Sequence, residues 1–335
     1  MMYAEMANTA NLDVFDFDFS LPEVRRKFAV KHPMLDRKYI VTTDQLTEFY
    51  EVAYDWVVAR KSGLYCAGLE RTGKTTAIEY AIDVLRQELP FVAIRYLSGQ
   101  RNPNQKKDSF CAQILEEWKF SIGKLRGARP ATVLANYLMT ACAELGGRHC
   151  VIFIDEAQLF SVIHYRYLLE LWNSLAKEGY LLCTILVGQP QIRSLKSLTK
   201  ELDHGAVVSR FFVKLYQIGG LKNVAALQIF LSHYDSELVY PAGSDWSFSR
   251  FFLQKAYDNG WRIEQEAPRF WASLENVSKA KQSSIRASGF RIAWIVDAIH
   301  TFLLDGMPRD SKEFKGTQNL WSECLLAGTE ADLIL

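Results

Sequence analysis

The spacing of hydrophobic and polar positions changes along the chain and predicts two regions of different structure. Up to residue 218, short apolar runs alternate with segments of helical spacing. The apolar runs are expected to be strands, at residues 64–67, 91–97, 149–155, 181–187 and 213–218. Strands that alternate with helices indicate an α/β fold, in which helices cover both faces of a five-stranded, mainly parallel sheet in an αβα sandwich.

After Gly219 and Gly220 the pattern is helical. Helices are expected at residues 223–234, 245–259, 267–281 and 290–304. We therefore expect four segments, of which the last is mixed and turn-rich: an N-terminal extension at 1–40, an α/β domain at 41–218, a small all-helical lid domain at 219–305 and a C-terminal tail at 306–335.

The N-terminal extension carries an unusual alternation of acidic and apolar residues. Residues 11–19 read Asn-Leu-Asp-Val-Phe-Asp-Phe-Asp-Phe. Strict alternation predicts an edge strand or an extended docking segment. The alternative is a flexible acidic segment, which would have the same composition. A simpler possibility for both the N-terminal extension and the C-terminal tail is that they only pack on the core.

Composition excludes several classes of function. The formal net charge is +1, so no global basic field favours nucleic acid, and any such binding requires a local patch. The six cysteines show no C-x-x-C spacing and are expected to be reduced core residues. The N-terminus lacks a signal-peptide pattern, and no apolar run reaches about eighteen residues. We therefore expect a cytoplasmic protein that does not contact the membrane.

Residues 68–75 read Gly-Leu-Glu-Arg-Thr-Gly-Lys-Thr and match the P-loop pattern G-x-x-x-x-G-K-[ST]. An apolar run precedes them and a helical pattern follows, which is the context that a P-loop requires. In such a loop backbone N–H groups face phosphate oxygens, Lys74 reaches the β- and γ-phosphates, and the Thr75 hydroxyl ligates Mg²⁺. The alternative is a glycine turn that binds nothing. The predicted cofactors are ATP and Mg²⁺, and the predicted cofactor-binding residues of this loop are Gly68, Thr72, Gly73, Lys74, Thr75 and Thr76.

A second motif ends the strand at 149–155. Asp155 follows an apolar run and is suited to hold the magnesium shell, as the Asp of a Walker B motif does. The adjacent Glu156 is suited to act as the general base for the attacking water. Gln189 ends the next strand and could bind the γ-phosphate or the water. The structural alternative for Asp155 and Glu156 is a solvated strand end. The alternative for Gln189 is a capped strand end in a Gly-Gln-Pro turn.

Two arginines are candidates for sensing the nucleotide. Arg210 precedes the fifth expected strand, where an arginine can project to a neighbouring subunit's nucleotide and stabilise transition-state charge. A structural ion pair is its alternative. Arg291 begins a helix of the expected lid and could contact the γ-phosphate in its own subunit, and Arg286 competes for that role.

The order of these parts, GLERTGKT, VIFIDEAQ, VGQP, SRFF and then ASGFR in a helical lid, resembles that of an AAA+ ATPase. Within this class, the DEAQ sequence followed by a helix and a short strand resembles the TnsC/TniB-type regulators of CRISPR-associated and related transposons. MuB and IstB are similar in role. The resemblance covers residues 35–305.

The resemblance implies a function and a set of partners. Such proteins bind ATP between subunits, form rings or helical filaments on duplex DNA, and link a target-selection complex to the transposase. Hydrolysis then disassembles the filament. DNA-facing elements follow the second strand in this family, so the implied DNA contacts are sequence-independent ones from Arg101, Lys106 and Lys107, with a second set at Lys124, Arg126 and Arg129.

Alternatives remain open at this point. The basic residues could be ordinary solvated loop charges. Secretion-associated ATPases of the ExeA type share the DEAQ and GQP sequences and act on proteins without DNA. A loader of helicases on single strands would need aromatic stacking residues in the loop at 98–108, which has none.

Overall fold

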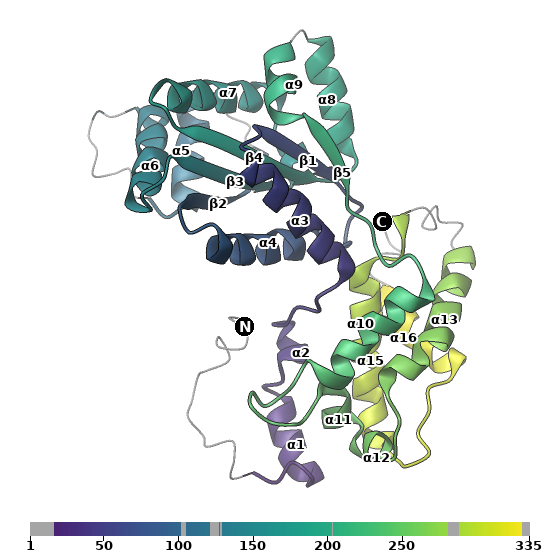
Figure 1. Cartoon of the computed structure of the whole chain (residues 1–335). Helices are drawn as coiled ribbons and strands as arrows, with labels where there is room; N and C mark the ends of the chain where they lie inside the picture. The colour runs from purple at the N-terminus through teal and green to yellow at the C-terminus, as the bar shows by residue number, and fades with distance from the viewer. Residues whose placement is uncertain are drawn as a thin grey trace. The chain divides into compact units, whose positions relative to one another are not determined.

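The computed structural model describes residues 17–101, 105–120, 127, 129–202, 204–280 and 288–329. They form two units, which are considered separately (Figure 1). The sheet unit is Asp44–Ile218, and the helical unit joins residues 17–43 to residues 219–329. Outside the described residues lie the part of the acidic alternation at 11–16 and the candidates Lys124, Arg126 and Arg286.

Within the described residues, the sheet unit contains five parallel strands in the order β2-β3-β4-β1-β5. They are β1 (Gly63–Ala67), β2 (Val92–Ser98), β3 (His149–Asp155), β4 (Leu181–Gly188) and β5 (Lys214–Gln217). The predicted α/β fold with a five-stranded parallel sheet is confirmed.

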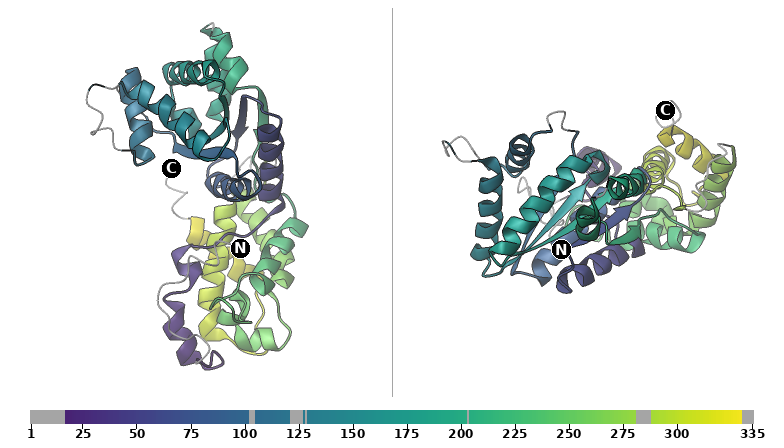
Figure 2. Two further views of the ribbon diagram at one scale, coloured as in Figure 1. Left: turned by 60° about the vertical axis from the view of Figure 1, so that its left-hand side comes forward. Right: turned by 90° about the horizontal axis from the view of Figure 1, so that it is seen from above.

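Helices cover both faces of this sheet, which explains why its central strands are apolar on both sides. In β3, Cys150 and Ile152 pack into the core cluster on one face, and Val151 and Phe153 alternate with them. Helices α3 (Asp44–Val58) and α4 (Lys74–Glu88) pack together on one side of the sheet (Figures 1 and 2). The other side carries α5 (Lys107–Glu117), α6 (Pro130–Glu144), α7 (Val162–Lys177), α8 (Gln191–Glu201) and α9 (Gly205–Phe211).

Because the strands are parallel, their carboxyl ends meet along one edge of the sheet. At this carboxyl edge, β1 ends before the P-loop sequence, β3 ends with Asp155 and β4 ends with Gly188. The opposite, amino edge carries the first residues of the strands. There Gly63 begins β1 so close to the Arg210 carbonyl that a Cβ on Gly63 would overlap it.

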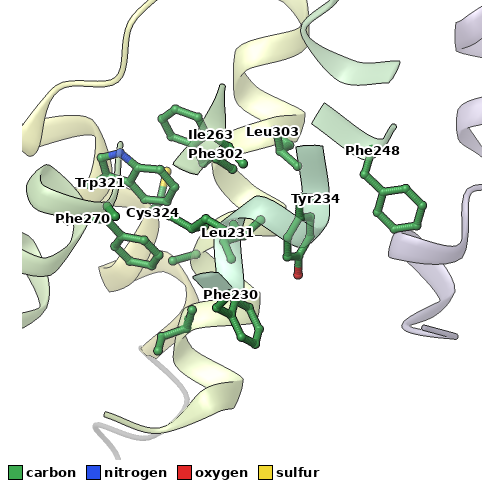
Figure 3. Packing of buried hydrophobic residues seen from close by; sticks show 14 of the residues in the cluster. Phe230, Leu231, Tyr234, Phe248, Ile263, Phe270, Phe302, Leu303, Trp321 and Cys324 are labelled. Atoms are coloured by element: carbon green, nitrogen blue, oxygen red, sulfur yellow. The ribbon is translucent and has the colours of Figure 1, made fainter. Parts of the chain in front are cut away.

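The helical unit is built around stacked aromatic rings. Its helices are α1 (Pro22–Ala29), α2 (Pro33–Asp36), α10 (Val224–Ser236), α11 (Phe248–Phe252), α12 (Gln254–Asp258), η5 (Ile263–Glu266), α13 (Ala267–Ala280), α15 (Ile292–Gly306), η6 (Met307–Arg309) and α16 (Gln318–Thr329). Trp321 stacks on Phe302 and on Phe270, with ring centroids 4.0 and 4.1 Å apart (Figure 3). Phe19 and Met34, from the N-terminal extension, are buried in the same cluster. Among the described helices, none combines the length and hydrophobicity needed to cross a membrane.

Two secondary-structure predictions for this unit are wrong. Residues 318–329 form a helix where turn-rich structure was expected, because a helix buries Trp321 and Leu325 on one side. The single helix expected at 245–259 is broken at Leu253. Phe251, Phe252 and Leu253 are all fully buried, and three consecutive residues cannot share one face of a straight helix.

Candidate nucleotide site

A glycine-containing loop joins β1 to α4 at the carboxyl edge. Gly68 starts the loop, and a Cβ there would lie 2.9 Å from the Ile218 carbonyl oxygen and 3.2 Å from Thr72 Oγ1. Gly73 caps α4 with φ 86°, a left-handed conformation that glycine adopts without strain. Both glycines therefore allow the chain to curl around the first N–H groups of a 15-residue helix, at the positive end of its dipole.

Two polar side chains close onto this loop. Lys74 is only 6% exposed, and its Nζ donates a hydrogen bond to the Leu69 carbonyl at 2.8 Å. The Thr72 hydroxyl donates to the same carbonyl at 2.8 Å. Thr76 lies in the first turn of α4. The loop thus holds a buried cation beside a helix N-terminus, which is the arrangement that binds a polyphosphate.

The end of β3 meets the start of α4 through side chains. Thr75 Oγ1 donates to Asp155 Oδ2 at 2.6 Å, although eighty residues separate them in the sequence. Asp155 is 3% exposed, and its Oδ1 accepts the Glu156 N–H at 2.8 Å. A hydroxyl and a carboxylate oxygen in contact are the hard ligands that Mg²⁺ prefers, so these two residues would fit a magnesium ion that accompanies a bound nucleotide.

Tyr96, on β2, is a further neighbour of Asp155 and was not predicted from the sequence. Its hydroxyl lies 3.5 Å from Asp155 Oδ2. Burial, followed by the negative charge of Asp155, raises the pKa of Tyr96 to about 12. The phenol therefore stays protonated at neutral pH and can donate to the carboxylate. No sequence motif pointed to this contact, which depends on the pairing of Tyr96 with Phe153 in the sheet.

Glu156 follows Asp155 in a left-handed conformation, with φ 47°. Its Oε2 accepts a hydrogen bond from Gln158 Nε2 at 2.5 Å. Gln158 Oε1 in turn accepts the Gln189 N–H at 3.0 Å. The structure therefore links Glu156 to the backbone of Gln189 through Gln158. The sequence signal for Gln158 was the last letter of the DEAQ sequence, which contributed to the family resemblance but was given no role at the site.

The loop after β2 starts beside Asp155 and Glu156, at the end of β3. The Gly99 N–H donates to the Asp155 carbonyl at 2.7 Å, and a Cβ on Gly99 would lie 2.5 Å from the Glu156 carbonyl. Arg101 and Lys106, of the predicted DNA-binding set, are exposed. Lys107 forms an ion pair with Glu170 of α7 at 2.5 Å, and Arg129 is an exposed residue before α6.

Arg210 lies elsewhere in the sheet unit. It belongs to α9, one of two helices between β4 and β5 that the sequence did not predict, and its guanidinium lies over the Trp172 ring at 4.5 Å. Its backbone contacts Gly63 at the amino edge, at the opposite end of β1 from the P-loop. The five residues of β1 separate the two edges by roughly 15 Å. The structure therefore does not bring Arg210 to the P-loop of its own subunit.

Arg291 lies in the helical unit. It is the residue before α15, and its guanidinium lies 4.9 Å from the centre of the Trp294 ring. Gly289, two residues earlier, has φ 79°, and a Cβ there would lie 2.5 Å from the Gly220 carbonyl. Gly289, in the ASGFR sequence, thus crosses closely over Gly220 within the helical unit.

These features define the class of the protein. A P-loop after β1, an Asp-Glu pair at the end of β3 and a glutamine after β4, in a parallel sheet of this order, are the arrangement of an AAA+ P-loop fold. Residues 58–195 match the family described as "AAA domain". The matched residues contain the P-loop, Asp155, Glu156 and Gln189, and the chain carries an ATPase domain of this type.

Comparisons with other proteins add only distant similarities. A comparison with curated proteins gave no match. Among solved structures, the chain is similar to the Aeropyrum pernix ORC1 protein in complex with DNA, with 12% identity, a TM-score of 0.48 and coverage of 88% of this chain and 66% of that one. It is also similar to domain III of the Thermotoga maritima replication initiation protein DnaA, with 12% identity, a TM-score of 0.44 and coverage of 87% of this chain and 94% of that one. For Drosophila ORC bound to AT-rich DNA and Cdc6 the identity is 11% and the TM-score 0.43. The match covers 90% of this chain and 44% of that one, so this chain spans less than half of it.

Proposed function

We propose that this protein is an ATP-dependent, DNA-binding regulator of transposition that assembles with copies of itself on duplex DNA. In this proposal ATP joins neighbouring subunits, the assembly connects a target-selection complex to the transposase, and hydrolysis drives disassembly. The motif resemblance to TnsC/TniB-type regulators supports the transposition role. The observation that carries the assembly step is the position of Arg210, at the edge of the sheet opposite to its own P-loop.

Each site residue has a proposed part in this cycle. The loop from Gly68 to Thr76 holds the phosphates, and Thr75 and Asp155 hold Mg²⁺. Glu156 accepts a proton from the water whose oxygen attacks the γ-phosphorus as ADP leaves. Gln189 orients that water or the γ-phosphate, Arg291 contacts the γ-phosphate from the lid formed by residues 219–305, and Arg210 reaches the nucleotide of the next subunit.

A mixing experiment tests the role of Arg210. Lys74→Ala removes the phosphate cation but keeps Arg210, and Arg210→Ala removes the arginine but keeps the P-loop. Each variant alone is expected to lose hydrolysis by roughly 10³-fold or more. A mixture of the two should regain activity, because a junction between them combines an intact P-loop with an intact arginine. A mixture as inactive as its parts would contradict an arginine acting between subunits.

Arg148→Ala is the matched control for this experiment. Arg148 also lies at the amino edge, is exposed, and has its guanidinium 5.7 Å from the centre of an aromatic ring, that of Tyr180. Its removal should leave both the activity and the mixing result unchanged.

Assembly on DNA is tested separately with ATP, a non-hydrolysable analogue and duplexes of random sequence. Negative-stain microscopy is expected to show ATP-dependent oligomers on DNA that Glu156→Gln stabilises and Lys74→Ala prevents. Binding should weaken steeply with salt, and Arg101→Ala with Lys106→Ala should reduce the salt slope by about one for each phosphate that the protein no longer neutralises. Oligomers that form equally well without DNA would favour an ATPase that acts on protein partners only, and monomers under all conditions would rule out the proposal.

A further inference from the structure

Gln158 connects two parts of the nucleotide site that arise from different strands. Its Nε2 donates to Glu156 Oε2 at 2.5 Å, at the end of β3. Its Oε1 accepts the Gln189 N–H at 3.0 Å, at the end of β4. Both polar atoms of the amide are therefore satisfied at once, and the direction of each bond fixes which way the amide points.

The surroundings are shaped to hold this amide. A Cβ on Gly188 would overlap Gln158 Oε1, so only glycine at the end of β4 leaves room for the side chain. Gln158 lies in η4 (Ala157–Leu159), and the hydroxyl of the fully buried Tyr165, on α7, donates to the Ala157 carbonyl at 2.8 Å. The Leu159 N–H donates to the Glu156 carbonyl at 2.9 Å, which closes the turn between them. The backbone that carries Gln158 is thus held against α7.

Glu156 needs such a partner because its own support is limited. It is partly exposed, and its backbone has a left-handed conformation, which is uncommon for a residue with a side chain. A glutamate side chain turns about three bonds, so without a fixed donor it would sample several directions. One hydrogen bond to Oε2 removes most of this freedom and leaves lone pairs on Oε1 to accept a proton.

We propose that Gln158 is a positioning residue for ATP hydrolysis, whose amide aims the Glu156 carboxylate at the attacking water and ties it to the end of β4. This inference rests on the proposed role of Glu156 as general base. It gives the glutamine of the DEAQ sequence a function, and it joins Glu156 to the strand end that carries Gln189.

Two substitutions of Gln158 separate the two bonds. Gln158→Leu keeps the size and removes both, whereas Gln158→Glu keeps the length and an acceptor for the Gln189 N–H but loses the donor to Glu156. Both variants should lower kcat by about 10- to 100-fold, the effect of a misplaced reacting group. The dissociation constant for a non-hydrolysable ATP analogue should change by less than about threefold, because the P-loop remains intact. Gln191→Leu, an exposed glutamine at the start of α8, is the matched control and should leave kcat unchanged.

A second measurement uses a protein that has already lost the base. If Gln158 acts through Glu156, then Gln158→Leu added to Glu156→Gln should lower the residual rate by less than about threefold, since residues that act as a unit are not additive. Gly188→Ala, which displaces the amide without altering Gln158 or Glu156, should lower kcat in the same direction and serves if Gln158→Leu does not fold.

The outcomes that would overturn the inference are distinct from failure of the proposed function. A wild-type or raised kcat in Gln158→Glu, or full additivity with Glu156→Gln, overturns the positioning role while Glu156 remains the base. Undiminished hydrolysis by Glu156→Gln removes the base itself, and the inference falls with it.

Discussion

Both units bury charged side chains, but the partners of these side chains differ. In the sheet unit, Asp155 meets the Thr75 hydroxyl at the carboxyl edge, and Lys74 meets a loop carbonyl. In the helical unit, Asp235 accepts the N–H groups of Ile263 and Glu264, both at 3.1 Å, where η5 begins. The first set lies in the proposed nucleotide site, beside the N-terminus of α4, whereas the second joins η5 to α10 through backbone groups that would otherwise be buried without partners.

Glu266 shows the structural use of a buried carboxylate most fully. It is 1% exposed, and its Oε1 accepts the Trp261 Nε1–H and the Gly316 N–H, both at 3.0 Å. Its Oε2 lies 3.2 Å from Arg269 Nη1. Burial of a charge therefore does not mark a functional site in this protein. The position of the charged group, beside the N-terminus of α4 or inside the helical unit, separates the proposed ligand-binding groups from groups that hold the fold together.

The largest expected effect that tests this distinction is a loss of ATP hydrolysis. Lys74→Ala should weaken hydrolysis by roughly 10³-fold, about 4 kcal/mol in transition-state free energy, because the cation at the phosphates is lost. The melting temperature should change little, since the loss of the hydrogen bond to the Leu69 carbonyl is offset by the removal of a buried charge. Hydrolysis assays and thermal melts by circular dichroism measure the two quantities.

Glu70→Ala is the control in the same loop, because Glu70 is exposed and its loss should leave both quantities unchanged. A large fall in the melting temperature of Lys74→Ala would mean that the lysine stabilises the fold. The buried charges of the sheet unit would then have the same structural use as those of the helical unit.

The reverse behaviour is expected of Glu266→Gln. The amide oxygen carries no full charge, so its bonds to the two N–H groups weaken, and the amide NH₂ cannot replace the ion pair with Arg269. The helical unit should lose about 2 to 3 kcal/mol of stability. ATP-analogue binding to the sheet unit's P-loop should be retained. Urea unfolding followed by tryptophan fluorescence measures the loss, since Trp261 and Trp321 lie in this core.

Arg269→Ala sharpens that prediction. Arg269 is about half exposed, so its ion pair is screened and should contribute less than about 1 kcal/mol. If Arg269→Ala costs as much as Glu266→Gln, the ion pair and not the two N–H groups holds Glu266 in place.

The sequence predicted the sheet unit better than the helical unit, for a physical reason. Each buried strand left an apolar run, and the phosphate loop needs glycines and a lysine at fixed spacing, so both could be recognised locally. In the helical unit the core depends on residues far apart in the chain, such as Phe19, Phe270 and Trp321. The short helix at 318–329 gave too few turns for its periodicity to stand out, and the break at Leu253 comes from three consecutive buried residues.

Within the site, the sequence indicated which residues end the strands but not how they meet. Asp155 and Thr75 were predicted from two separate motifs, and their hydrogen bond depends on the parallel register of the sheet. Tyr96 and Gln158 belonged to no predicted function, because their contacts exist only after β2, β3 and β4 align. Arg210 was assigned from its place before β5, whereas α9, which holds it at the amino edge, left no clear periodic signal.

A further expected effect, smaller than that of Glu266→Gln, concerns pH and again separates the units. His32 is fully buried among aromatic rings, and its Nδ1 accepts the Met34 N–H at 3.1 Å. Burial, then the charge of His300, lowers the pKa of His32 from 6.5 to about 3. The folded unit therefore favours the neutral ring, and the stability that this provides is lost as pH falls below 6.5 toward the folded-state value. Between pH 7 and pH 5 the loss is about 2 kcal/mol.

Replacing His32 by phenylalanine isolates the part of the free energy of unfolding that depends on protonation of His32. His32→Phe should lose the cap to Met34, which contributes about 1 kcal/mol at every pH, but the variant has no imidazole to protonate. Compared with the wild type by urea unfolding, the variant should therefore gain about 2 kcal/mol between pH 7 and pH 5. A difference that stays constant across this range would show that His32 is protonated as easily in the folded unit as in the unfolded chain.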